Sequence, residues 1–322
     1  MKERNSEMSK SASMDVKRRG RVRKFSRNFL HHWPLWVMML PAILYILLFV
    51  YKPMYGIVIA FKQFSFRKGI MGSDWIGLAN FSRLIASYWF PVIVRNTLTL
   101  SILSLIVSFP MPIILALSAN EIGNEHVKKI FQTVSYAPHF ISTVVMCGII
   151  ILFLSPSNGI INHIIRFFGG EEYFFMQEEA AFKWVYVLSG VWQNTGWSAI
   201  IYYAALSGVD QSLLEAAEID GASRLKRIIY INFPVLVPTI SVLFILNCGS
   251  LLSIGYEKVF LLQNQTNISS SEVISTYVYK VGLINADYGF STAASLLNSV
   301  VNSIVLIGAN TLSREVTSNS LW

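Results

Sequence analysis

The sequence has few charged residues and almost no cysteine. Asp, Glu, Lys and Arg make up only 14% of the 322 residues, whereas an ordinary soluble domain carries about 25%. Hydrophobic residues make up 53%, and the mean hydropathy is +0.50. A surface with so little charge must face something less polar than water, which excludes a chain of soluble globular domains. The only two cysteines, Cys147 and Cys248, lie in apolar stretches, which excludes a disulfide-stapled secreted domain and favours buried thiols.

The missing charges define six long gaps along the chain. The stretches without Asp, Glu, Lys or Arg are 28–51, 96–120, 130–165, 184–209, 228–256 and 288–313. Crossing a bilayer core takes about 20 helical residues, so each gap can hold one spanning helix, and none alternates like a membrane strand. We therefore predict an all-α membrane protein with six transmembrane helices, placed near residues 35–51, 96–119, 134–154, 184–206, 235–256 and 291–312.

Basic residues predict the orientation of these helices. Ten Lys or Arg lie in the first 33 positions, and with six spans both termini share one side. That side carries sixteen of the 26 basic residues, so the positive-inside rule places the termini in the cytoplasm. The net charge of +8 is thus an orientation signal rather than a nucleic-acid site. We expect a basic cytoplasmic segment at 1–33, a six-helix domain at 34–313 and a cytoplasmic tail at 314–322.

Several kinds of chemistry are absent. The predicted spans contain no Asp, Glu, Lys or Arg, which proton-coupled transporters and pumps usually need at membrane depth. His139 is the one histidine within a span, and a structural hydrogen bond explains it best. We find no catalytic motif, no metal-ligand spacing and no phosphate-binding P-loop. If this chain works by ATP hydrolysis, another subunit must bind the nucleotide.

The connection at 207–234, between predicted spans four and five, differs from the other loops. Ser212 and Glu215 have the spacing of a capping box and predict the start of a short helix. Gly221 predicts a left-handed turn at its end, and Ser223 can cap a second helix before Pro234. Such a helix–glycine–helix loop is a rigid connector, a DNA-binding helix-turn-helix or a knob that docks on a partner. Its acidic first helix and the flanking spans disfavour DNA, but the physics alone does not choose between a partner and none.

This loop resembles the EAA signature of ABC importer permeases. Glu215-Ala216-Ala217, Gly221 and Ile231-x-Phe233-Pro234 match its spacing at every step, with Phe233 where the family prefers Leu. Further segments are similar to the LplB-type oligosaccharide permeases, and they are 51–62, 75–81, 136–142, 274–279 and 320–322.

The resemblance implies a type I ABC importer permease fold in a bacterial cytoplasmic membrane. It implies a heterodimer with a second homologous permease, two ATPase subunits that bind ATP and magnesium, and an extracytoplasmic solute-binding lipoprotein. Cargo would be an oligosaccharide, such as those from pectin, xylan or alginate. Glu215 would contact a groove of the ATPase, Ala216 and Ala217 would allow close approach, and Gly221 would provide the turn. The alternatives are a facilitator or sodium-coupled carrier that works without an ATPase and, in another class, a membrane-embedded enzyme or scaffold.

Polar and aromatic residues inside the spans are candidates for the sugar path. They are Trp192, Gln193, Asn194, Trp197, Asn247, Ser250, Asn298 and Asn302. Aromatic faces suit the C–H surfaces of sugars, and amides and hydroxyls suit their hydroxyl groups. Polar side chains also bond helices together in membranes, and for any one of these residues that explanation is favoured.

Overall fold

The computed structural model describes residues 33–317 and 319–322. The predicted basic segment therefore lies outside the described residues, apart from Trp33. The chain divides into two compact units, Met1–Val58 and Ile59–Trp322.

The described part of the first unit is a helix of changing width. It consists of α2 (Trp33–Ile46), the π-helix η1 (Leu47–Tyr51) and α3 (Lys52–Met54), and it leads into the 3-10 helix η2 (Tyr55–Phe61). Pro53 cannot donate a backbone hydrogen bond, and the turn before it widens to π. The run Trp33–Phe61 has 29 residues and is apolar enough to span a membrane.

The second unit begins within η2, forms a small two-stranded sheet and continues through helices. In chain order the elements are β1 (Lys62–Gln63), α4 (Gly69–Gly72), β2 (Asp74–Trp75), α5 (Ala79–Ile85), α6 (Trp89–Ser108), α7 (Pro110–Asn120), α8 (Glu125–Tyr136), η3 (Ala137–Phe140), α9 (Thr143–Phe153), α10 (Ile160–Phe167), α11 (Glu179–Leu206), α12 (Gln211–Ile219), α13 (Arg224–Arg227), η4 (Ile228–Asn232), α14 (Phe233–Gly249), α15 (Tyr256–Leu262), α16 (Ile268–Ser271), α17 (Ile274–Tyr279), η5 (Lys280–Ile284) and α18 (Tyr288–Thr317). The strands pair antiparallel, Lys62 with Trp75 and Gln63 with Asp74.

The third predicted span, 134–154, is wrong as one straight helix. Glu125–Phe140 and Thr143–Phe153 meet at 95°. Pro138 lies in η3 just before the break, and the Ser142 side chain caps α9 by accepting from the Val145 N–H. The free carbonyl of Ile141 accepts a hydrogen bond from Gln193 Nε2 at 2.9 Å. Irregular backbone inside a membrane needs such a partner because lipid supplies none.

The count of six spans stays a prediction. Four helical runs in the described residues are long and apolar enough to cross a membrane, and the bent pair would make a fifth. The remaining candidate is α11, which has 28 residues but does not reach that hydropathy. At about 1.5 Å per residue α11 is long enough to span a membrane. The polar residues in its middle lower its hydropathy below that of the other runs.

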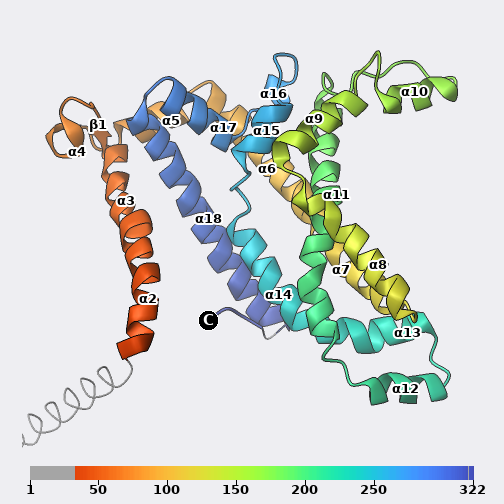
Figure 1. Cartoon of the computed structure of the whole chain (residues 1–322). Helices are drawn as coiled ribbons and strands as arrows, with labels where there is room; N and C mark the ends of the chain where they lie inside the picture. The colour runs from red at the N-terminus through yellow and green to blue at the C-terminus, as the bar shows by residue number, and fades with distance from the viewer. Residues whose placement is uncertain (1–32, 318) are drawn as a thin grey trace, which may run out of the picture. The chain divides into compact units, whose positions relative to one another are not determined.

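The helices of the second unit pack closely around α11 and α14. Figure 1 shows α18 running beside α14, and α11 packs against α6 and α7. Gly196 brings α11 onto the backbone of α8, because an added Cβ would lie 2.0 Å from the Ser135 carbonyl oxygen. Buried residues of α7, α11 and α14 form one core cluster, which includes Ala116, Tyr202 and Leu236. Both cysteines are free and buried, as predicted.

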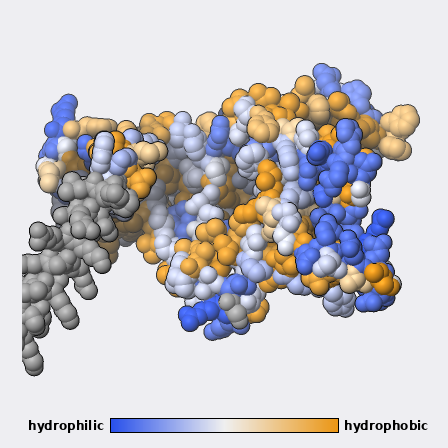
Figure 2. Space-filling model, turned by 60° about the horizontal axis from the view of Figure 1, so that its bottom comes forward, coloured by the Kyte–Doolittle hydropathy of each residue, from blue (hydrophilic) through white to orange (hydrophobic). Residues whose placement is uncertain are grey.

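Much of the hydrophobic surface has no cover within this chain. In the three apolar runs Trp89–Asn120, Arg224–Gly249 and Tyr288–Thr317, only 22–28% of the most apolar window is buried. Hydrophobic side chains accordingly occupy much of the surface visible in Figure 2. A soluble protein rarely exposes apolar patches of this extent, so these faces are built to meet lipid or another apolar chain.

Candidate functional site

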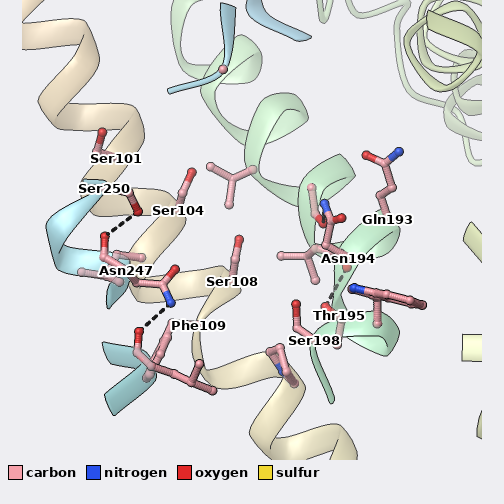
Figure 3. A pocket seen from close by; sticks show the side chains of 18 of the residues that line it. Ser101, Ser104, Ser108, Phe109, Gln193, Asn194, Thr195, Ser198, Asn247 and Ser250 are labelled. Atoms are coloured by element: carbon pink, nitrogen blue, oxygen red, sulfur yellow. Dashed lines mark hydrogen bonds between the residues drawn. The ribbon is translucent and has the colours of Figure 1, made fainter. Parts of the chain in front are cut away.

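A cavity of about 930 Å³ lies between α6, α7, α11 and α14. In Figure 3 the side chains of α6 and α14 stand on one side and those of α11 on the other. The connection from α14 to α15 adds the final part of the wall, including Ser253 and Gly255. The cavity is lined mainly by hydroxyl, amide and aromatic side chains together with aliphatic ones.

The wall from α11 explains why this helix does not reach the hydropathy of the four runs that could span a membrane. Asn194, Thr195 and Ser198 line the cavity, and so does Trp197. The Asn194 Oδ1 lies 3.1 Å from His139 Nδ1, and the His139 ring stacks on Trp197 with centroids 4.5 Å apart and planes at 6°. His139 therefore holds two cavity residues in place through a hydrogen bond and a stacked ring, in agreement with the structural role that the sequence indicates.

Three serines of α6 form a polar stripe that sequence analysis missed. Ser101, Ser104 and Ser108 line the cavity (Figure 3). Their spacing of three and four residues places them on one face of a helix, and this spacing was the available signal. Ser101 Oγ is buried and has no hydrogen-bond partner among the described residues. An unpaired hydroxyl beside a cavity is suited to a polar ligand, because leaving it without a partner is costly.

The two α14 candidates lie on the same side as these serines. Asn247 Nδ2 donates to the Leu243 carbonyl at 2.8 Å, which leaves its Oδ1 as a free acceptor among the described residues. The Ser250 hydroxyl donates to the Asn247 carbonyl at 3.2 Å. Both side chains line the cavity.

The remaining sequence-predicted residues have other surroundings. Gln193 touches the cavity, but its amide points away from it in Figure 3 and serves the break at Ile141. Trp192 is half exposed and does not line the cavity. Asn298 lines a separate, apolar pocket, where its Oδ1 has no partner among the described residues.

Asn302 is a connector rather than a cavity residue. Its Oδ1 accepts from the Leu252 N–H and its Nδ2 donates to Ser253 Oγ, both at 2.9 Å. These bonds fasten α18 to the connection between α14 and α15. The structure thus brings five of the eight path candidates to one cavity and leaves Trp192, Asn298 and Asn302 outside it.

The second candidate site is the loop from α11 to α14. Its helix α12 begins at Gln211 and is capped by Asp210, whose carboxylate accepts from the Ser212 N–H at 2.9 Å. The predicted capping box from Ser212 is therefore wrong, because Asp210, two residues earlier, already satisfies that terminus. The same hydrogen bond holds the pKa of Asp210 below its usual value, so this cap stays charged at neutral pH.

The turn after α12 has the conformation that the sequence predicts. Gly221 has φ of +77°, in the left-handed region, and Ser223 caps α13 by accepting from the Lys226 N–H. From Arg224 the helix continues without a break to Gly249. Pro234 lies in the first turn of α14, directly after the π-helix η4, so the widened turn accommodates its missing N–H.

One arginine ties this loop to the bundle. Arg227 Nη1 lies 2.7 Å from Glu218 of α12, and Nη2 lies 3.8 Å from Glu121 at the end of α7. Glu121 in turn accepts from Asn232 Nδ2 at 3.3 Å. The Arg227 side chain is only 16% exposed, so water screens it less than an ordinary surface pair. Sequence analysis missed this node because it joins residues more than 100 positions apart.

The outer surface of α12 is left open. None of its residues is buried, and Figure 1 shows α12 standing clear of the other helices. Leu213 is 57% exposed and Ile219 is 86% exposed. The Glu215 side chain makes no ion pair or hydrogen bond with any other described residue. A short helix that presents an acidic side chain and bare apolar ones is suited to enter a groove on a partner.

Comparison with known proteins places this architecture. The family described as binding-protein-dependent transport system inner membrane component matches residues 108–318. YteP of Bacillus subtilis (strain 168), a polygalacturonan/rhamnogalacturonan transport system permease protein, is 42% identical over 288 residues, which cover 89% of this chain and 90% of YteP. Protein LplB of the same strain is 38% identical over 288 residues, covering 89% and 91%.

A solved structure is similar over nearly the whole chain. It is a bacterial alginate ABC transporter in complex with an alginate pentasaccharide-bound periplasmic protein. One of its chains matches with a TM-score of 0.84 and 39% identity, over 92% of this chain and 99% of that one. The resemblance drawn from the loop at 207–234 is confirmed.

Proposed function

Since this chain belongs to the binding-protein-dependent transport system inner membrane components, we propose that it forms half of the translocation path of an ATP-driven oligosaccharide importer. The proposed substrates include oligosaccharides that contain uronate. Similar chains are named for the transport of polygalacturonan or rhamnogalacturonan, and for alginate. All of these polysaccharides carry carboxylates, although rhamnogalacturonan also contains neutral sugars.

The cavity is the observation that carries the sugar assignment. Its volume of about 930 Å³ lies within the range of ligand pockets. The stripe of Ser101, Ser104 and Ser108 and the amides of Asn194 and Asn247 offer donors and acceptors for sugar hydroxyls. Trp197 offers an aromatic face for their C–H surfaces.

Coupling to ATP hydrolysis is assigned to α12. Glu215, with Ala216 and Ala217 beside it, would enter a groove of an ATPase subunit, and Gly221 would set the angle of the helix. Arg227 supports this role because it joins α12 to the ends of α7 and α14. A displacement of α12 would thereby reach two helices that line the cavity. Pro234 lies on the same route, at the start of α14.

The complete transporter would contain four further parts. They are a second homologous permease, two ATPase subunits that bind ATP and magnesium, and an extracytoplasmic solute-binding lipoprotein. The open hydrophobic faces of the spans support contact with lipid and with the second permease. Both termini would lie in the cytoplasm, as the distribution of Lys and Arg indicates.

Transport in sealed vesicles tests this proposal. We expect sugar uptake only when this chain is reconstituted with a second permease, an ATPase and the binding protein. Uptake should also require ATP on the side of the membrane where the ATPase lies. A facilitator or sodium-coupled carrier would behave differently. Uptake by this chain alone, without nucleotide, would establish that alternative and refute the proposal.

A further inference from the structure

Among the described residues that line the cavity, only Lys258 is charged. Lys258 is the third residue of α15, the short helix that follows the connection from α14, and it lines the cavity. Its Nζ donates to the Tyr186 carbonyl of α11 at 2.6 Å and lies 4.5 Å from the centroid of the Tyr186 ring. No other Lys or Arg from the described part of the chain lines the cavity, so this ammonium is the main positive charge that a ligand there would meet.

A glycine leaves room for this ammonium. Gly190 follows Tyr186 by one helical turn and also lines the cavity. A Cβ added at Gly190 would lie 3.1 Å from Lys258 Nζ, closer than ordinary van der Waals contact. The ammonium therefore rests directly against the α11 backbone, in the wall of the cavity.

The ammonium has no negative partner in the described part of the chain. Lys183 pairs with Glu179, and Lys280 pairs with Glu272, but no carboxylate lies within ion-pair distance of Lys258. An ammonium has three N–H donors, and only one is used here, by the Tyr186 carbonyl. Two donors are thus free at a site where a cation without a counter-ion is costly.

The amine stays mostly protonated at neutral pH. Burial away from water lowers the pKa of Lys258 to about 8, which is still above neutrality. Three titratable groups lie around the Lys258 amine. They are the Cys147 thiol of α9, the Tyr186 phenol of α11 and the carboxylate of Glu257, which precedes Lys258 in the sequence. Tyr279 of α17 stacks on Tyr256 instead.

We propose that Lys258 is the specificity-determining residue of the cavity and that its free N–H groups bind the carboxylate of an acidic oligosaccharide. A neutral sugar of the same shape would leave the ammonium without a counter-ion. The cavity would then favour acidic sugars by electrostatics, in addition to any selection by the binding protein. This assignment rests on the proposed function of the chain.

Import of two matched sugars tests the assignment. Trigalacturonate carries carboxylates, and α-1,4-galactotriose carries a neutral CH₂OH group in the same places. Both are imported by the reconstituted transporter with the same binding protein, so the preference of the binding protein divides out when variants are compared. For Lys258→Met we expect the ratio of acidic to neutral import to fall about tenfold or more, as for the loss of a hydrogen bond to a charged group.

Two further variants keep the test decisive. Lys258→Gln can still donate a hydrogen bond to the Tyr186 carbonyl, so it serves if the methionine variant does not assemble. We expect the same fall in the ratio of acidic to neutral import. Lys183→Met removes a lysine that is paired with Glu179 and does not line the cavity, so the ratio should stay at the wild-type value.

The possible failures are distinguishable. If the Lys258 variants lower import of both sugars equally, or leave the ratio unchanged, Lys258 only fastens α15 to α11 and the assignment is refuted. If the wild-type assembly imports neither sugar, the proposed function is refuted for these substrates, and the assignment that rests on it is refuted as well.

Discussion

Replacing Gly221 by Ala tests the coupling loop through backbone conformation alone. Gly221 has φ of +77°, and no atom lies within 4 Å of the position where a Cβ would be added. Ala would therefore create no collision, and its whole cost would come from the left-handed conformation, about 1–2 kcal/mol. An energy of that size changes a population ratio by about five- to thirtyfold.

The strained turn would release α12 from its place. No residue of α12 is buried, so the turn at Gly221 and the ion pair between Glu218 and Arg227 hold the helix. We expect Gly221→Ala to insert and assemble normally but to lower sugar-stimulated ATP hydrolysis by about five- to thirtyfold, in line with that population change. The assay is ATP hydrolysis by the reconstituted transporter with loaded binding protein.

A matched glycine provides the control. Gly123 lies in the loop between α7 and α8, also has open space around it, and does not have a positive φ. Gly123→Ala should therefore keep wild-type stimulation. Gly221→Asn should be less impaired than Gly221→Ala, because Asn tolerates the left-handed region. Equal stimulation in the Gly221→Ala and Gly123→Ala proteins would refute the reasoning.

Three other outcomes are expected from the same contacts. Gly196→Ala places a Cβ 2.0 Å from the Ser135 carbonyl oxygen, so it should lower the thermal stability of the purified transporter by about 1–3 kcal/mol or more, whereas Gly148→Ala, in open space, should not. Arg227→Met leaves two carboxylates unpaired and should weaken stimulated ATP hydrolysis more than it weakens assembly on a sizing column; an unchanged rate would exclude Arg227 from coupling. Because the pKa of Lys258 is about 8, its ammonium is present below that pH and lost above it, so the ratio of acidic to neutral sugar import should fall as the pH rises through 8, and a flat ratio would contradict the assignment.

Charge-free stretches predicted the long helices well because a charged side chain is costly in lipid. They could not reveal the 95° bend at Ile141 and Ser142. Hydropathy measures how apolar a stretch is and carries no information about its direction, and Pro138 was the only local signal. The break also depends on Gln193, which lies in another helix and supplies the hydrogen bond that makes the bend tolerable.

The candidate site was predictable where a residue's role follows from its local environment. Gly221 and Ser223 adopt the predicted turn and cap because both are decided by a few neighbouring residues. Asn302 shows where this prediction fails. The amide of a membrane helix can bond a ligand in a cavity or the backbone of a neighbouring segment equally well, and here it bonds the Leu252 backbone. Lys258 was overlooked because it follows the predicted span, and only the folded chain places it in the cavity wall.

Photo-cross-linking from α12 tests the central claim most directly. A light-activated amino acid in place of Ile219, which is 86% exposed, would report what that helix touches in the assembled, actively importing transporter. The account predicts an adduct with an ATPase subunit that changes in yield between the nucleotide-free and ATP-bound states. Reaction with water alone in both states would contradict it.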